Sequence, residues 1–230
     1  KALTTTEKQE LATIEARLFE ALDIKKAPRK DVSKAYNTFK TAAIRPSGNG
    51  FTGAPIVAPD ELNRQKGEIS LNDLEDMLSG FAYDACYNHS AQSMKNYFLV
   101  WDYAINQGFA FGSGMGTNHH YGYQIRKIYT TAWLMRDAIW KAPNRDNILS
   151  ALIFWSALQE TRIPYQYGRD ELLDSWHTLL MPKTISALMF VDERERARAL
   201  TGLSRWLSGS LQYSPGTIGG IKVDGTTFHH

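Results

Sequence analysis

The sequence has little of what marks several classes of protein. A single cysteine, Cys86, among 230 residues excludes an intrachain disulfide and any CxxC or Cys/His zinc pattern, although it does not fix the compartment. No stretch reaches the ~18–20 consecutive apolar residues of a membrane-spanning helix. The 26 basic and 24 acidic residues leave a net charge of only +2. We therefore expect no membrane partner and no nucleic-acid partner.

Apolar and aromatic residues, in contrast, are plentiful. Hydrophobic residues make up 43% and charged residues 22%, which is typical of a globular protein. The length allows one large domain, or two small ones, with a sizeable core. The first residue is Lys1, and neither Met nor an apolar signal region is present there, so we expect a chain that has been processed or cut.

Helical periodicity runs through almost the whole chain. After Thr caps, Leu11, Ile14, Leu18 and Leu22 recur at steps of three and four. The pattern predicts eight to ten helices, with no firm strand, over 4–22, 31–44, 70–89, 93–109, 121–142, 144–161, 171–190 and 192–213. Short turns favour antiparallel neighbours, which leaves a helical bundle or an α/α toroid. The Gly- and Pro-rich 47–59 and the tail 214–230 are predicted to be loops.

The polar stretch GTNHHYGYQIR, residues 116–126, follows a glycine-rich segment where a helix is expected to begin. On a helix starting near Asn118, the side chains of His119, Tyr123 and Arg126 share one face. Such a helix start favours an anion, through its unpaired N–H groups and its partial positive charge. The alternative is that the histidines only satisfy loop carbonyls, and the sequence leaves both interpretations open.

Metal, nucleotide and serine-hydrolase sites find no support in the motifs. Adjacent histidines on a helix point about 100° apart, and HExxH spacing is absent. GSGMG is not followed by GK[ST], and there is no GxSxG elbow. His229 and His230 close the chain, and on their own they are compatible with the start of a purification tag.

Two stretches resemble a known family. GFAFGSGMGTNHHYGYQIR, with IYTTAWLMRDA after it, is similar to the middle of the chondroitin sulfate ABC lyases, and GGIKVDGTTFHH at 219–230 is similar to the segment that carries their catalytic histidine. These enzymes belong to a polysaccharide lyase family that includes chondroitin AC and hyaluronate lyases. The resemblance implies an all-α fold for 1–230, an incomplete α/α toroid of antiparallel helical hairpins. It also implies a secreted or periplasmic protein.

The reaction implied by the resemblance is β-elimination at the uronic acid of chondroitin- or dermatan-sulfate-type glycosaminoglycans. The uronate C5 proton is too weakly acidic to be removed unless the neighbouring carboxylate is neutralised. A base then takes the proton, and an acid protonates the departing O4. No cofactor is required, no metal ligands are identified, and the sequence does not decide whether a divalent cation assists.

The family pattern assigns roles to particular residues. His230 matches the catalytic histidine, the candidate general base, and His119 or His120 takes the carboxylate, with His119 preferred. On helix geometry alone, and not from the family pattern, Tyr121, Tyr123 and Arg126 are candidates for lining the substrate cleft. Three tryptophans are candidates for stacking on sugar faces, although core packing is the favoured interpretation for each: Trp101, Trp133 and Trp155.

The sequence also departs from the family. The family's catalytic tyrosine, arginine and glutamate lie beyond the position of His230, and the flanking β domains and the rest of the toroid are absent. We therefore expect 1–230 to be part of a longer lyase, with the other domains as its partners, and to be inactive or nearly inactive alone. Two rivals remain: an α/α-toroid glycoside hydrolase using two of Asp102, Glu160 and Asp170, and a non-catalytic helical module that binds acidic polysaccharide.

Overall fold

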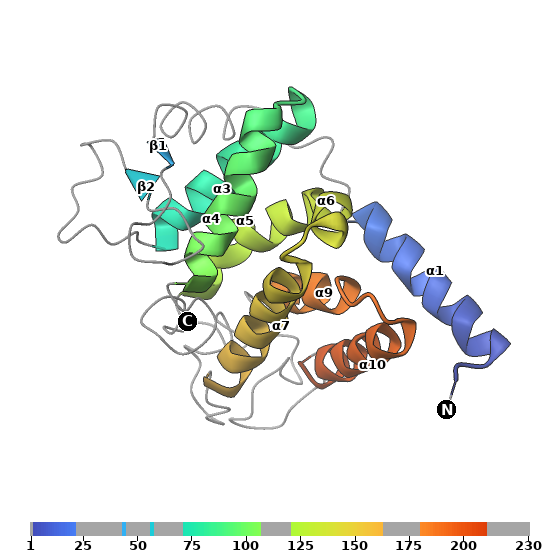
Figure 1. Cartoon of the computed structure of the whole chain (residues 1–230). Helices are drawn as coiled ribbons and strands as arrows, with labels where there is room; N and C mark the ends of the chain where they lie inside the picture. The colour runs from blue at the N-terminus through green and yellow to red at the C-terminus, as the bar shows by residue number, and fades with distance from the viewer. Residues whose placement is uncertain are drawn as a thin grey trace.

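The computed structural model describes residues 2–21, 43–44, 56–57, 71–106, 121–162 and 180–210. The helices are α1 (Thr5–Ala21), α3 (Leu71–Tyr87), α4 (Ala91–Asn106), α5 (Tyr121–Leu134), α6 (Arg136–Lys141), α7 (Arg145–Arg162), α9 (Leu180–Leu188) and α10 (Glu193–Ser210). The strands are β1 (Ala43–Ile44) and β2 (Ile56–Val57), each two residues long. Helices dominate every long described segment (Figure 1), which confirms the all-α class.

Two helix boundaries differ from the prediction. Ala43 and Ile44 were expected to end a helix, but they form β1, which pairs antiparallel with β2. A nearby Pro46 disfavours helical backbone before it, so the helix pattern extended too far. The single helix expected over 121–142 is divided at Met135, where φ is −92° and ψ is 6°, so that α5 and α6 are separate.

α3 and α4 form an antiparallel hairpin, closed by a polar network around Asp84. This buried carboxylate accepts hydrogen bonds from Asn88 Nδ2 at 2.8 Å and from Ser93 Oγ at 2.5 Å. Burial raises its pKa, but the hydrogen bonds from Asn88, Ser93 and Ser90 outweigh burial and hold the pKa below its usual value. His89, in the turn, has a φ of 56°.

α3 and α5 lie side by side and run in the same direction. Early in both helices, Lys127 Nζ of α5 lies 2.9 Å from Glu75 Oε1 of α3. Late in both, Cys86 Sγ of α3 lies 3.3 Å from Met135 Sδ, next to the end of α5. α4 packs on α3 as well, and the three helices form one group in Figure 1. The first turns of α3 and α5 therefore lie at the same end of this group.

The core runs from this group to α7, α9 and α10, because the helical stripes predicted from sequence face one another. The largest fully buried side chains are Trp101, Trp155, Tyr97, Tyr129, Leu74, Met77, Leu78, Ile128 and Met135. Such aromatic rings bury about 150–250 Å² each, which makes them the main source of hydrophobic stabilisation.

One carbonyl joins three helices inside this core. The oxygen of Leu152, in α7, accepts hydrogen bonds from Tyr129 Oη of α5 at 2.5 Å and from Ser186 Oγ of α9 at 3.3 Å. Burial raises the pKa of Tyr129 far above its usual value, so the phenol is a permanent donor. The position of α5 relative to α7 and α9 is therefore fixed by directional contacts as well as by packing.

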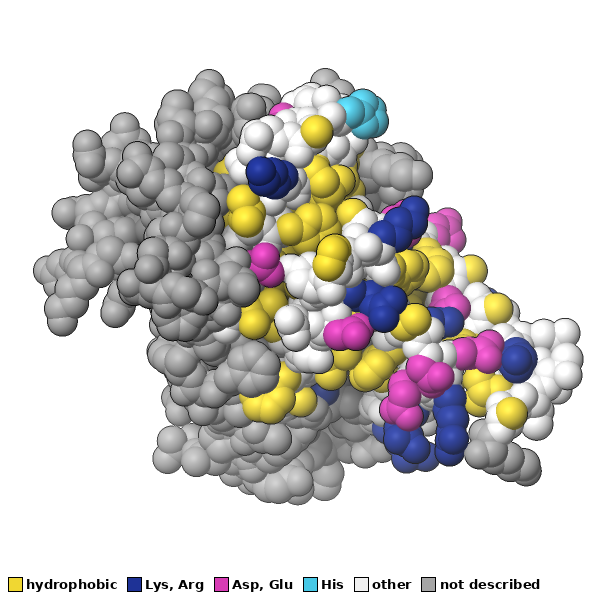
Figure 2. Space-filling model, in the orientation of Figure 1, with side chains coloured by type: hydrophobic (Ala, Val, Ile, Leu, Met, Phe, Trp, Pro, Cys, Tyr) yellow, Lys and Arg dark blue, Asp and Glu magenta, His cyan; other side chains and the backbone are white. Residues whose placement is uncertain are grey.

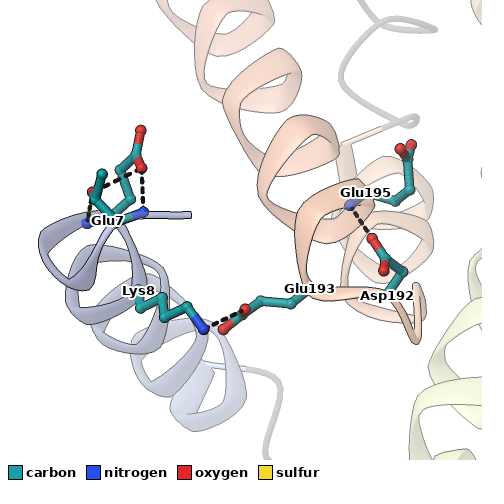
Figure 3. A network of polar contacts seen from close by, with 6 residues as sticks. Glu7, Lys8, Asp192, Glu193 and Glu195 are labelled. Carbon is teal, nitrogen blue, oxygen red and sulfur yellow. Dashed lines mark hydrogen bonds and ion pairs between the residues drawn. The ribbon is translucent and has the colours of Figure 1, made fainter. Parts of the chain in front are cut away.

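α1 lies along the outside of the molecule (Figure 1), where it contributes Leu11 to the core and makes polar contacts at its start. Thr4 and Glu7 form a capping box, with Thr4 N donating to Glu7 Oε2 at 2.7 Å and Glu7 N donating to Thr4 Oγ1 at 3.3 Å. Lys8 reaches Glu193 of α10 at 3.3 Å, an exposed ion pair that contributes roughly 0–1 kcal/mol. Figure 3 shows these contacts beside the cap of α10, where Asp192 Oδ1 accepts from Glu195 N.

Two further contacts join α1 to its neighbours. Arg196 of α10 donates to the carboxylate of Glu15, and the Phe19 ring stacks on Trp133 with centroids 4.9 Å apart. The Arg136 guanidinium lies 4.6 Å from the Trp133 ring centroid, as in a cation–π contact. Among the helices that the structure describes, none is both long enough and apolar enough to cross a membrane.

Candidate functional site

The predicted catalytic residues lie outside the described residues. This applies to His119, His120 and His230, so their roles stay predictions. The helix expected after the histidine pair is present as α5, and its described part begins at Tyr121. Tyr121 and Tyr123 occupy the first turn of α5, although the structure describes only their backbone. In the sequence the histidine pair directly precedes Tyr121, the first described residue of α5.

Arg126 is the one predicted cleft residue whose exposed side chain the structure describes. It lies in the second turn of α5, next to the exposed Lys127. Its positive charge acts on the buried carboxyl of Glu75, where it lowers the pKa. An exposed guanidinium at this end of α5 is able to bind a carboxylate or a sulfate with two parallel hydrogen bonds.

Trp101 does not lie where the substrate-binding assignment requires. Its side chain is 0% exposed, so both faces of the ring are covered by protein. The reason is its position in α4 with Tyr97, Val100 and Ala104, which are also fully buried. Trp133 and Trp155 are buried as well. The structure therefore supports the core interpretation that the sequence favoured for these rings, and gives no support for sugar stacking by Trp101.

A buried carboxylate beside the second turn of α5 was missed in the sequence. Glu75 of α3 is 6% exposed, and its Oε1 accepts from Lys127 Nζ at 2.9 Å, while Asp76 Oδ1 accepts from the same ammonium at 3.2 Å. A signal was available, because Glu75 stands four residues after Leu71 and three before Leu78, on the apolar face of its helix.

The electrostatics of this cluster follow from its burial. Loss of water raises the pKa of Glu75 above its usual value, and Lys127 offsets only part of that effect. Partial burial lowers the pKa of Lys127, but the carboxylates of Glu75 and Asp76 raise it by more. Lys127 therefore stays protonated, and its charge is committed to two carboxylates of α3 rather than offered to a ligand.

The hydrolase interpretation gains nothing from the described carboxylates. Asp102 accepts a hydrogen bond from Asn144 Nδ2 at 2.5 Å, which ties α4 to the start of α7, and burial raises its pKa. The side chain of Glu160 and the whole of Asp170 lie outside the described residues. Within 2–21, 71–106, 121–162 and 180–210, no group of three or more His, Cys, Asp or Glu side chains is placed to hold a metal ion.

The charged surface carries both signs. On the face shown in Figure 2, the basic and acidic side chains of the described residues are interspersed, most densely over α1 and α10. Such a mixed surface creates no large field of one sign. On this face, attraction of an anionic ligand therefore depends on individual basic groups rather than on a field of one sign.

Comparison with known proteins places the whole chain in one family. The family model described as "Lyase, catalytic" matches residues 1–230. A chondroitin sulfate ABC exolyase of Bacteroides thetaiotaomicron is 34% identical over 142 residues, which cover 60% of this chain and 14% of that protein. A chondroitin sulfate ABC endolyase of Proteus vulgaris is 25% identical over 224 residues, which cover 89% of this chain and 22% of that protein. A chondroitin sulfate ABC exolyase of Proteus vulgaris is 30% identical over 178 residues, which cover 72% of this chain and 18% of that protein.

The lengths of the relatives bear on what the chain represents. It spans between 14% and 22% of the length of these curated relatives. The family match, in contrast, runs from the first residue to the last, and the helical fold agrees with it. The chain therefore belongs to the family of lyase catalytic domains.

Proposed function

We propose that this chain is part of a polysaccharide lyase that cleaves chondroitin- and dermatan-sulfate-type glycosaminoglycans by β-elimination. The observation that carries the proposal is the match of the lyase catalytic family to the whole chain. The names of the similar proteins, chondroitin sulfate ABC exolyase and endolyase, supply the substrate class. A polysaccharide of this kind lies outside the cell, so a secreted or periplasmic location accompanies the proposal.

In this mechanism the start of α5 binds the acidic sugar. His119, or His120 next to it, neutralises the uronate carboxylate, which lowers the free energy of the enolate-like intermediate. The partial positive charge at a helix start contributes in the same direction. Arg126, one turn further on, is placed for the carboxylate or a sulfate, and Tyr121 and Tyr123 line the cleft. Contacts with α3, α7 and α9 hold α5 in place, beginning with Lys127 in its second turn.

His230 removes the C5 proton in this proposal. Its imidazole accepts the proton as the C–H bond breaks, and the electron pair forms the C4–C5 double bond while the bond from C4 to the glycosidic oxygen breaks. An acid gives its proton to the leaving oxygen, so the products are an unsaturated uronate and a new hydroxyl. The proposed scaffold is an incomplete α/α toroid, supported by the α3–α4 hairpin and by the parallel relation of α3 and α5.

The test is product formation by the full-length protein, because the relatives are several times longer than this chain. Incubation with chondroitin sulfate should yield the ultraviolet absorbance of a conjugated double bond. Hydrolysis would add water and leave no such absorbance. New reducing ends without absorbance would therefore point to a glycoside hydrolase, and binding without new ends would point to a polysaccharide-binding module.

Single substitutions separate the roles of the histidines. His230→Ala should lower kcat by about 10²–10⁴-fold, as expected for loss of a general base. His119→Ala should lower kcat by about 10²–10³-fold, and His120→Ala by less. A matched control is His89→Asn, because His89 is exposed in the α3–α4 turn and Asn tolerates its positive φ. Normal turnover in His230→Ala would overturn the assignment of the base.

A further inference from the structure

The contact between Glu75 and Lys127 is not accounted for by the fold alone. Glu75 lies in α3 between Leu74 and Met77, both fully buried, at a position that an apolar side chain would fill. Its Oε2 is buried and has no hydrogen-bond partner in the described part of the chain. Removing a carboxylate from water is costly, and replacing a buried ion pair by apolar residues is often neutral or stabilising. A buried carboxylate with an unused oxygen therefore points to a role other than stability.

The location of the contact suggests the role. Lys127 stands six residues after Tyr121, which is about 9 Å along the helix axis. Within those two turns lie Tyr121, Tyr123 and Arg126, and the histidine pair immediately precedes them. The Glu75–Lys127 contact of 2.9 Å joins α3 to the second turn of α5, two residues before the Tyr129 contact to α7.

We propose that Glu75 is a positioning residue, which holds the first two turns of α5 against α3 through Lys127 and so fixes the residues that meet the uronate. This inference rests on the proposed lyase function. Glu75 itself does not touch the substrate, because it is 6% exposed and its bonded oxygen faces Lys127. Lys127 bridges to the half-exposed Asp76 as well, so it is held from two directions.

A positioning role predicts a particular kinetic signature. A shift of about 1 Å in a group that stabilises the transition state costs up to about 100-fold in rate. Glu75→Leu in the full-length protein should therefore lower kcat for chondroitin sulfate by about 10- to 100-fold, with KM changed by less than about threefold. Glu75→Gln keeps an oxygen that accepts from Lys127 and should recover most of the lost kcat.

The control is a second interhelical ion pair, which joins α1 to α10 and involves no residue of α3 or of the first two turns of α5. Glu15 of α1 accepts from Arg196 of α10, so Glu15→Leu removes a comparable carboxylate. Glu15→Leu should leave kcat and KM unchanged, whatever it does to the melting temperature. A purely structural role for Glu75 would instead lower the melting temperature and leave kcat per folded molecule at the wild-type value.

The outcomes separate this inference from the function on which it rests. No unsaturated product from the wild-type protein would refute the lyase function. An active wild type with kcat within about twofold for folded Glu75→Leu would refute only the positioning role. If Glu75→Leu does not fold, two other variants test the positioning role. Lys127→Met should show the same loss of kcat, and it should fold because Lys127 is more than half exposed, whereas Glu75→Gln should keep most of the wild-type kcat. Wild-type kcat in Lys127→Met would likewise overturn the proposal.

Discussion

Replacement of Trp101 tests whether this ring belongs to the core or to the substrate cleft. The side chain is fully buried in α4, among Tyr97, Val100 and Ala104, which are also fully buried. Removal of a buried aromatic side chain costs about 3–5 kcal/mol, because both the transfer energy and the packing of the cavity walls are lost. Since domains unfold with about 5–15 kcal/mol, Trp101→Ala should remove about a fifth or more of the stability of its domain. Trp101→Phe should cost about 1–3 kcal/mol.

Denaturant unfolding followed by circular dichroism measures this change as a lower midpoint with an unchanged slope. Under the proposed lyase function, KM for chondroitin sulfate, measured on the folded full-length Trp101→Phe protein, should stay at the wild-type value. Phe154→Ala on α7 is the comparison, because that aromatic ring is 44% exposed and its loss should cost less than the loss of the fully buried Trp101. The core assignment would be refuted if Trp101→Phe kept the wild-type midpoint and raised KM several-fold, since the ring would then contact the sugar.

Three further substitutions test the contacts that hold the helices. Tyr129→Phe should lower the unfolding free energy by about 1 kcal/mol rather than more, because the Leu152 carbonyl keeps its bond from Ser186; an unchanged denaturation midpoint would contradict the contact. The pKa of Asp84 is lowered in the folded state, so its stabilisation is present above its unfolded pKa and is lost as pH falls through the folded pKa. In Asp84→Asn the melting temperature should therefore fall less steeply than in the wild type as the pH is lowered from 6 to 2. Equal slopes for the two proteins would contradict this role of Asp84. Asp192→Ala removes the cap of α10 and should lower the unfolding free energy by about 1 kcal/mol in the denaturant assay. An unfolding free energy equal to that of the wild type would contradict the capping role.

The local pattern of the sequence was sufficient for the family and for most of the described helices, although not for β1 or for the division at Met135. Leu74 and Leu78 recur at helical spacing because 3.6 residues complete a turn, and both are fully buried in α3. The Thr4–Glu7 cap depends on residues three positions apart, so it too can be identified from a short stretch of sequence. The stretch at 108–126 indicated a lyase, and the family match to the whole chain agrees.

Only the tertiary structure decided which helix meets which. Glu75 and Lys127 are 52 positions apart, and nothing in either local pattern shows that α3 and α5 run side by side in the same direction. The burial of Trp101 likewise depends on what covers both faces of the ring, not on its spacing within α4. Periodicity fixes the face that a helix turns inward, because it reflects backbone geometry, whereas the partner on that face is set by packing between segments that are distant in the chain.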